Sequence, residues 1–125
     1  MSKTVFFVDD DKMILNLLEY TFQSRQQYKV ISFESGEDCI AALDMNPDLI
    51  VLDHQLSHGG EDKMDGIETL EKIRVTHPDM PVVVLTGQGT EDLFNKFKSK
   101  GVAAYLTKDD FFVDHLFETI REVLG

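Results

Sequence analysis

The sequence predicts an α/β fold: a doubly wound five-stranded parallel sheet with five helices on its two faces. Two observations carry this prediction. Short apolar segments alternate strictly with amphipathic stretches, and the links between them are short. A crossover that joins two parallel strands in this way is right-handed. With 125 residues, 42% of them hydrophobic, the chain fits a single domain, residues 1–125, with a real core.

Five strand-sized segments rich in apolar and β-branched residues predict the sheet. Three of them, VFFV, LIVL and VVVL, are near-continuous apolar runs, which are typical of strands covered on both faces. The other two are more polar or smaller, which suits the edges of a sheet and favours the strand order 2-1-3-4-5. The predicted strands are residues 4–8, 29–33, 49–52, 82–85 and 103–106.

The stretches between these strands repeat apolar residues at helical spacing and predict five helices. The first covers residues 12–25, and the second covers residues 36–45 with Ser35 as its N-cap. The third begins after Asp65-Gly66, and the fourth has Thr90 as a candidate cap and Gly101 past its end. The fifth carries the stripe Val113, Leu116, Phe117, Ile120 and Leu124.

Charge and composition exclude several classes of protein. The formal net charge is −11, from 23 acidic and 12 basic residues, and it opposes the phosphate attraction that nucleic-acid binding requires. No apolar run approaches the roughly 20 residues of a membrane-spanning helix, and carboxylates interrupt the N-terminal apolar stretch too early for a signal peptide. Cys39 is the only cysteine, and its pattern favours a core thiol. We therefore expect a cytoplasmic protein without direct nucleic-acid contact or membrane insertion.

Polar side chains follow the predicted strands at one rim of the sheet, where such folds bind ligands. Clustered carboxylates repel one another unless a cation compensates, and Mg²⁺ prefers oxygen ligands. The acids after the first strand could instead be favourable charges at a helix N-terminus, and Asp11 alone fits that role. The rim residues are Asp9, Asp10 and Asp11 after the first strand, Asp53 after the third, Thr86 after the fourth and Lys108 after the fifth.

These residue types suit phosphoryl transfer. Asp53 follows a buried strand and can serve as a fixed nucleophile toward phosphorus. Lys108 then supplies a mobile positive charge and Thr86 a hydroxyl donor for the phosphoryl oxygens. Taken singly, such a threonine more often satisfies backbone and such a lysine is more often solvated. Their joint placement is what favours function.

The motifs VDDD at 8–11, LIVLD at 49–53, DG at 65–66, VVVLTG at 82–87 and AAYLTK at 103–108 cover essentially the whole chain. In this order they resemble the receiver domain of two-component response regulators, similar to the single-domain chemotaxis regulator. The resemblance implies that Asp53 accepts a phosphoryl group in a Mg²⁺-dependent reaction. The donor would be a sensor histidine kinase, a histidine phosphotransfer protein or a small phosphodonor.

The resemblance also implies roles for individual residues. Asp10 would bind Mg²⁺ directly, Asp9 would act partly through water, and the backbone carbonyl of Gln55 would complete the ligands together with Asp53. Thr86 and Tyr105 would form a switch pair that alters the face of the fourth helix, fifth strand and fifth helix, where a downstream protein binds. The side chains of Gln55 and Gln88 would tune the lifetime of the phosphoryl group. No enzymatic activity beyond self-phosphorylation and autodephosphorylation is expected.

The sequence departs from the family pattern at two places. Asp109 follows the lysine where family members usually have proline, often with a cis bond, so the peptide is either trans with a shifted loop or cis under strain. The loop 57–64 is about five residues longer than usual and has Ser57 at a common proline position. It is either a tolerated insertion or a functional element beside Asp53, namely a lid or a partner-selecting loop.

Other residues near the rim carry weaker predictions. His54 and His58 show no metal-ligand spacing, so a zinc or iron site is not expected. Phe111 and Phe112 add more aromatic surface than one buried helix face needs, and we expect at least one of them to be exposed.

Four alternative functions remain open on the sequence alone. A metal-dependent phosphatase is disfavoured because Gln55, and not a second carboxylate, stands two residues after Asp53. A nucleotide or flavin binder is disfavoured because no glycine-rich loop follows the first strand. A degenerate receiver is disfavoured because all the expected site residues are present. The chain could also be the receiver part of a longer regulator whose output domain lies beyond Gly125.

Overall fold

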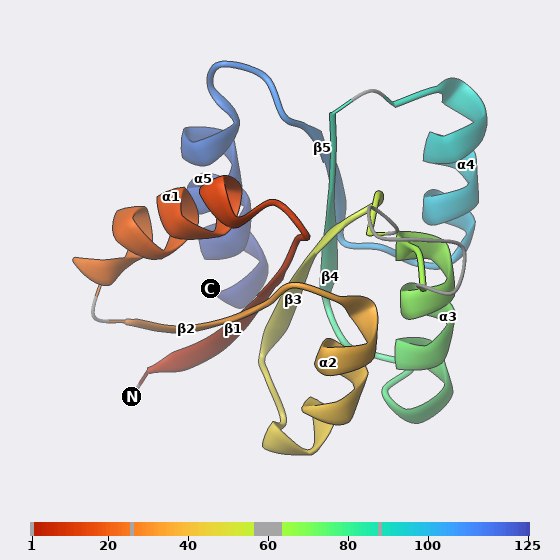
Figure 1. Ribbon diagram of the computed structural model, residues 1–125, viewed down its shortest axis with the longest axis horizontal. Helices are drawn as coiled ribbons and strands as arrows, with labels where there is room; N and C mark the ends of the chain where they lie inside the picture. Colours follow the sequence, from red (N-terminus) through yellow and green to blue (C-terminus); the bar gives the residue numbers. More distant parts are fainter. Residues whose placement is uncertain (1, 26, 57–63, 88) are drawn as a thin grey trace.

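The computed structural model describes residues 2–25, 27–56, 64–87 and 89–125. Its five strands form one parallel sheet in the order β2-β1-β3-β4-β5, which confirms the predicted fold class and strand order (Figure 1). Helices α1 and α5 cover one face of the sheet, and α2, α3 and α4 cover the other. The strands are β1 Lys3–Val8, β2 Tyr28–Phe33, β3 Leu49–Asp53, β4 Val82–Thr86 and β5 Ala104–Thr107.

The core has two layers because side chains alternate along each strand. In β1, Val5 and Phe7 pack under α1 and α5, whereas Phe6 and Val8 pack under α2, α3 and α4. The same alternation runs through β3 and β4, and both strands are buried along their whole length. The central strands therefore have no freedom to shift by one residue, and this rigidity fixes the side chains at their ends.

Four of the helices begin at side-chain caps, whereas α5 has none. Ser35 Oγ accepts a hydrogen bond from Asp38 N, and Thr90 Oγ1 accepts one from Leu93 N. Asp11 accepts from Met13 N, so this carboxylate serves as a helix cap. The helices are α1 Lys12–Gln23, α2 Gly36–Ala41, α3 Gly66–Thr76, α4 Glu91–Ser99 and α5 Phe112–Leu124.

The second helix is shorter than predicted. The sequence predicts one helix over residues 36–45, whereas α2 ends at Ala41 and is followed by a 3-10 turn, Leu43–Met45. Ala42 leaves helical geometry at φ −102°, and Asn46 then takes a left-handed conformation at φ 55°. This break keeps Leu43 buried in the core and turns the chain toward β3.

Arg74 of α3 ties the ends of two helices together. Its guanidinium donates hydrogen bonds to the carbonyls of Lys100 and Gly101, past the end of α4, at 3.0 Å each. It also donates to the carbonyl of Met80 at 2.7 Å. These carbonyls lie at helix ends and in a loop, where the backbone has unsatisfied acceptors. The C-terminal end of α4 is thereby fixed to α3.

Two further predictions concern composition. Burial raises the pKa of the Cys39 thiol to about 12, and the side chain is fully buried, so it is a core thiol as predicted. Within the described ranges, no helix combines the length and apolar character needed to cross a membrane.

Candidate functional site

The carboxyl ends of the parallel strands bring the predicted rim residues together. Asp9 directly follows β1, Asp53 is the last residue of β3, and Thr86 is the last residue of β4. Lys108 directly follows β5, at the sheet edge. Asp9, Asp53 and Thr86 are 5% exposed or less, although they are polar. Burial of polar side chains at strand ends is costly and marks this rim as the candidate site.

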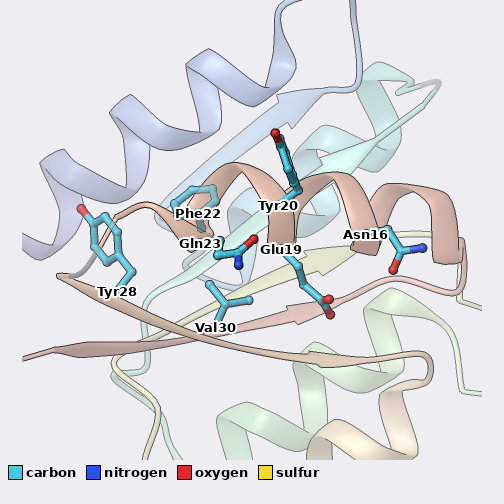
Figure 2. Close-up of a pocket in the computed structure, with 7 residues that line it drawn as sticks. All are labelled: Asn16, Glu19, Tyr20, Phe22, Gln23, Tyr28 and Val30. Carbon is cyan, nitrogen blue, oxygen red and sulfur yellow. The ribbon is translucent and has the colours of Figure 1, made fainter.

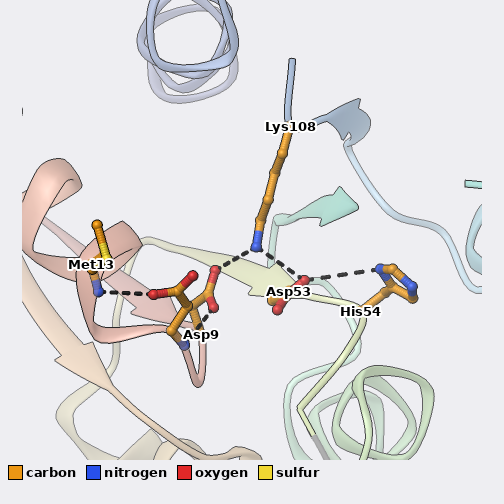
Figure 3. A network of polar contacts seen from close by, with 6 residues as sticks. Asp9, Met13, Asp53, His54 and Lys108 are labelled. Carbon is orange, nitrogen blue, oxygen red and sulfur yellow. Dashed lines mark hydrogen bonds and ion pairs between the residues drawn. The ribbon is translucent and has the colours of Figure 1, made fainter. Parts of the chain in front are cut away.

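Lys108 links the two buried carboxylates. Its Nζ lies 2.7 Å from Asp9 Oδ2 and 3.4 Å from Asp53 Oδ1 (Figure 3). Asp9 Oδ1 accepts a hydrogen bond from Asp11 N at 2.9 Å, so both oxygens of Asp9 are engaged. The ammonium therefore compensates a buried pair of negative charges, which would otherwise repel each other.

The surroundings of Asp53 raise the pKa of its carboxyl group toward neutral pH. Burial, followed by the charge of Asp9, raises the pKa of Asp53 to about 7. Lys108 and a hydrogen bond from the Gln55 backbone oppose this rise. For Lys108, burial acts to lower the pKa, but the contacts with Asp9 and Asp53 raise it on balance. A titratable group perturbed in this way by burial and a specific charge is typical of a functional site.

Three carboxylates fit a divalent cation. Asp9, Asp10 and Asp53 each offer an oxygen atom, and these atoms lie within 4.8 Å of one another. This is the one such group found in the part of the chain that the structure describes. A hollow of 420 Å³ lined by Asp10, Asp11, Lys12 and Glu34 opens beside Asp10. An all-oxygen set with access to water matches the preferences of Mg²⁺, so the residues present fit this ion.

Thr86 and Tyr105 lie on the α4 side of the sheet. Tyr105 packs against Phe94 and Phe97 of α4, with ring centroids 5.3 and 5.8 Å apart. A side chain at Gly89 would meet the Tyr105 hydroxyl at 2.6 Å and a methyl carbon of Thr86 at 3.2 Å. Among the described residues, neither the Thr86 nor the Tyr105 hydroxyl has a hydrogen-bond partner, although both are buried. The Tyr105 hydroxyl and the Thr86 methyl group therefore both lie beside Gly89.

The segment after β5 holds Lys108 without a proline. Lys108 N donates to Thr86 O at 2.7 Å, and Asp109 Oδ1 accepts from Phe111 N at 2.9 Å. No cis peptide bond occurs in the described ranges, so the Lys108–Asp109 peptide is trans. Asp109 therefore forms the turn that leads into α5. Phe111 is 65% exposed and Phe112 is buried, which confirms the expectation that at least one is exposed.

His54 is a site residue that sequence reasoning missed. Its Nδ1 lies 3.9 Å from Asp53 Oδ1, and burial lowers the pKa of the ring (Figure 3). The one usable signal in the sequence is that His54 directly follows Asp53. Gln55 is exposed beside the site. Gln88, His58 and residues 57–63 lie outside the described residues.

A separate groove lies away from this rim. It has a volume of 610 Å³ and runs between α1 and the edge strand β2 (Figure 2). None of its lining residues belongs to the acidic rim, so pocket size does not point to the chemistry here. The lining residues are Asn16, Glu19, Tyr20, Phe22, Gln23, Tyr28 and Val30.

Comparison with known families identifies a match over most of the chain. The model of the response regulator receiver domain matches residues 5–121. The chain is 35% identical over 111 residues to the alkaline phosphatase synthesis transcriptional regulatory protein PhoP of Bacillus subtilis, covering 86% of this chain and 43% of that protein. It is 27% identical over 128 residues to sporulation initiation phosphotransferase F of the same organism, covering 99% of this chain and 95% of that one.

Solved structures of receiver domains have the same fold as this chain. The signal receiver domain of a putative Luxo repressor protein from Vibrio parahaemolyticus superposes with a TM-score of 0.86 at 25% identity, covering 99% of this chain and 91% of that chain. A CheY-like receiver domain protein from Methanospirillum hungatei JF-1 gives a TM-score of 0.83 at 26% identity, covering 98% and 93%. The chain spans between 26% and 43% of the length of four transcriptional regulators that it matches.

Proposed function

Because this chain belongs to the response regulator receiver family, we propose that it accepts a phosphoryl group on Asp53. The observation that carries the proposal is the Asp9–Lys108–Asp53 contact at the rim, with distances of 2.7 and 3.4 Å. Receivers take phosphoryl groups from histidine kinases or phosphotransfer proteins, and this partner class applies to the family as a whole. Self-phosphorylation from a small donor and autodephosphorylation are the activities proposed for this chain.

The residues divide the work of the transfer. A carboxylate oxygen of Asp53 attacks phosphorus, the bond from phosphorus to the donor nitrogen breaks, and the donor imidazole leaves with the electron pair. Lys108 is already 3.4 Å from Asp53 and neutralises charge on the phosphoryl oxygens. The Thr86 hydroxyl, buried and without a partner among the described residues, donates to another of these oxygens. Catalysis is then mainly positioning and electrostatics.

The metal would be held by Asp10, Asp53 and the backbone carbonyl of Gln55, with Asp9 acting partly through water. Both Asp9 oxygens already have partners, which supports an indirect role for this carboxylate. When bound, Mg²⁺ supplies positive charge to the phosphoryl oxygens during transfer. The side chains of Gln55 and Gln88 are proposed to tune the lifetime of the phosphoryl group.

Exposed apolar residues near the rim support docking of a phosphodonor. Met13 and Leu17 of α1 are 79% and 42% exposed, and Phe111 before α5 is 65% exposed. The helices α1 and α5 cover the same face of the sheet (Figure 1). The match to sporulation initiation phosphotransferase F covers 99% of this chain and 95% of that protein, and it supports a switch or relay module with residues 1–125 as one receiver domain. A cytoplasmic location stays a prediction.

The test of the acceptor is phosphorylation with acetyl phosphate and Mg²⁺, followed by intact mass. The wild-type protein is expected to gain the mass of one phosphoryl group, and the Asp53→Asn variant is expected to gain none, since an amide is not a nucleophile here. Asp110→Asn removes an exposed carboxylate of the same segment as Lys108 and serves as the control. An equal gain in the Asp53→Asn protein would reject Asp53 as the acceptor.

The switch is proposed to run through Thr86 and Tyr105 to the face of α4, β5 and α5, where a downstream protein binds. The Tyr105 ring lies inward, and Gly89 leaves room for it. Gly89→Ala is expected to drive the ring outward, because the new methyl carbon would lie 2.6 Å from the hydroxyl. NMR contacts between the rings of Tyr105 and Phe97 would then disappear.

A second variant checks the cause of that movement. In a Tyr105→Phe background the hydroxyl is gone, and its 2.6 Å contact with the alanine methyl goes with it. The ring is then expected to keep its contact with Phe97 when Gly89 is replaced by alanine. Loss of the contact in both backgrounds would show that Gly89 acts on the loop and not on the hydroxyl.

A further inference from the structure

His54 is held rigidly at both of its backbone groups. Its N–H donates to Leu85 O at 3.1 Å, and its carbonyl accepts from Gly66 N at 3.1 Å. A Cβ at Gly66 would lie 2.6 Å from His54 Cα, so the two backbones are in close contact. With both hydrogen bonds made and the helix packed against it, the Cα–Cβ bond of His54 has a fixed direction.

The strand register places His54 beside Thr86. Asp53 is the neighbour of Leu85 in the β3–β4 pair, so the next position on each strand is His54 and Thr86. The hydrogen bond from His54 N to Leu85 O extends the parallel ladder to this point. Because side chains alternate, the side chains of His54 and Thr86 leave on the same side of the sheet, opposite to that of Asp53.

Both neighbours carry a buried polar atom without a partner. Over the residues that the structure describes, His54 Nδ1 and Thr86 Oγ1 make no hydrogen bond. The His54 side chain is 11% exposed, so water replaces little of what is missing. Nδ1 lies 3.9 Å from Asp53 Oδ1, too far for a hydrogen bond. Unpaired buried groups are costly and are tolerated where a ligand satisfies them.

We propose that His54 donates a hydrogen bond from Nδ1 to the phosphoryl group on Asp53. This inference rests on the proposed function and adds a contact to those of Lys108 and Thr86. A phosphoryl group extends from the carboxylate oxygen and carries three acceptor oxygens, so it reaches across a gap that the carboxylate leaves open. The contact exists only in the phosphorylated protein, and it therefore stabilises that state relative to the unmodified one.

The test uses beryllofluoride, a mimic of the phosphoryl group, bound to the full chain with Mg²⁺. His54→Leu removes the donor, and its affinity for beryllofluoride is expected to be about 10-fold weaker, the range for one hydrogen bond to a charged acceptor. His54→Asn keeps an N–H donor close to the position of Nδ1, and its affinity is expected to recover most of the loss. Fluorine NMR of the bound mimic should show one of its fluorine resonances shifted in the leucine variant.

The control is His77→Leu. The Nδ1 of His77 already contacts Thr76 Oγ1 at 2.8 Å, and the residue lies at the C-terminal end of α3. Its affinity for beryllofluoride is expected to equal that of the wild type. If the leucine variant does not fold, the wild-type protein still decides. Nitrogen NMR of the His54 ring should show a protected Nδ1–H, coupled to fluorine, only when the mimic is bound.

The outcomes separate the two proposals. Wild-type protein that neither binds beryllofluoride nor gains mass from acetyl phosphate would overturn the phosphoacceptor function itself. Wild-type binding with equal affinity in the His54→Leu variant would overturn the role of His54 and leave Asp53 as the acceptor. Equal weakening in the leucine and asparagine variants would reject the hydrogen bond, because asparagine retains the donor.

Discussion

Replacing Asp53 with asparagine is expected to raise the free energy of unfolding by up to about 4 kcal/mol at pH 8 in the absence of Mg²⁺. The reason is the raised pKa of Asp53, about 7 against 3.8 for an ordinary aspartate, which burial and then Asp9 cause. Above pH 7 the folded protein must hold this carboxylate ionised where it is unfavourable. The asparagine amide has nearly the same shape and no charge.

The gain should depend on pH in a defined direction. A carboxyl group with a raised pKa in the folded state favours folding at low pH, and this contribution is lost as the pH rises from about 4 to about 7. The difference between the two proteins is therefore expected to be largest at pH 8 and to shrink to less than half of that at pH 5. Urea unfolding at the two values measures it.

The exposed Asp110 provides the matched control, since Asp110→Asn makes the same change of charge outside the cluster. Its effect on stability is expected to stay within about 0.5 kcal/mol at both pH values. A variant of Asp53 that is less stable than the wild type at pH 8 would contradict the electrostatic explanation. It would show instead that the contact with Lys108 outweighs the burial of the charge.

Gly66→Ala is expected to destabilise the fold by about 3 kcal/mol. A Cβ at this position would lie 2.6 Å from His54 Cα and 2.8 Å from the carbonyl oxygens of Asp53 and His54. These are backbone atoms of a buried strand end, and they cannot move aside as a flexible side chain would. The displaced strand end should also slow phosphorylation of Asp53, since a nucleophile out of place by a fraction of an ångström attacks poorly.

The sign of the change in stability distinguishes a steric clash from helix propensity. Gly66 is the first residue of α3, and helix propensity alone would make alanine the better residue by up to about 1 kcal/mol. Gly87→Ala is the control, because a Cβ there meets nothing within 4 Å. Urea unfolding measures the free energy of unfolding of the wild type and of the two variants. A Gly66→Ala protein as stable as the wild type would show that the helix can shift away from the strand end.

The sheet and the rim could be predicted because they depend on patterns within short segments of the sequence. VFFV, LIVL and VVVL are apolar throughout, so their burial on both faces follows from composition. Once the strands are parallel, the residues at their carboxyl ends must share a rim, and this alone brings Asp9 near Asp53. Single-residue caps such as Ser35 and Thr90 are also local and were predicted.

What the sequence could not predict depends on contacts between distant segments. The break between Ala41 and Leu43 serves the core and not the helix, so helical periodicity gives no sign of it. The close contact of Gly66 with His54 depends on where α3 meets β3. The position of His54 depends on the register of β3 against β4, in which Asp53 pairs with Leu85. Its Nδ1 then lies 3.9 Å from Asp53 Oδ1. The spacing of His54 from His58 does not match a metal site, and it indicates no other role.

The hydrogen bonds of Arg74 have a mechanical consequence for α4. They clamp the C-terminal end of the helix through Lys100 and Gly101, while the N-terminal end adjoins Gly89, against which the Tyr105 hydroxyl lies. If the proposed switch moves Tyr105, we therefore expect α4 to rotate about its C-terminal end instead of translating along its axis. The largest displacement is then expected in the first turn of the helix, at Glu91 and Asp92.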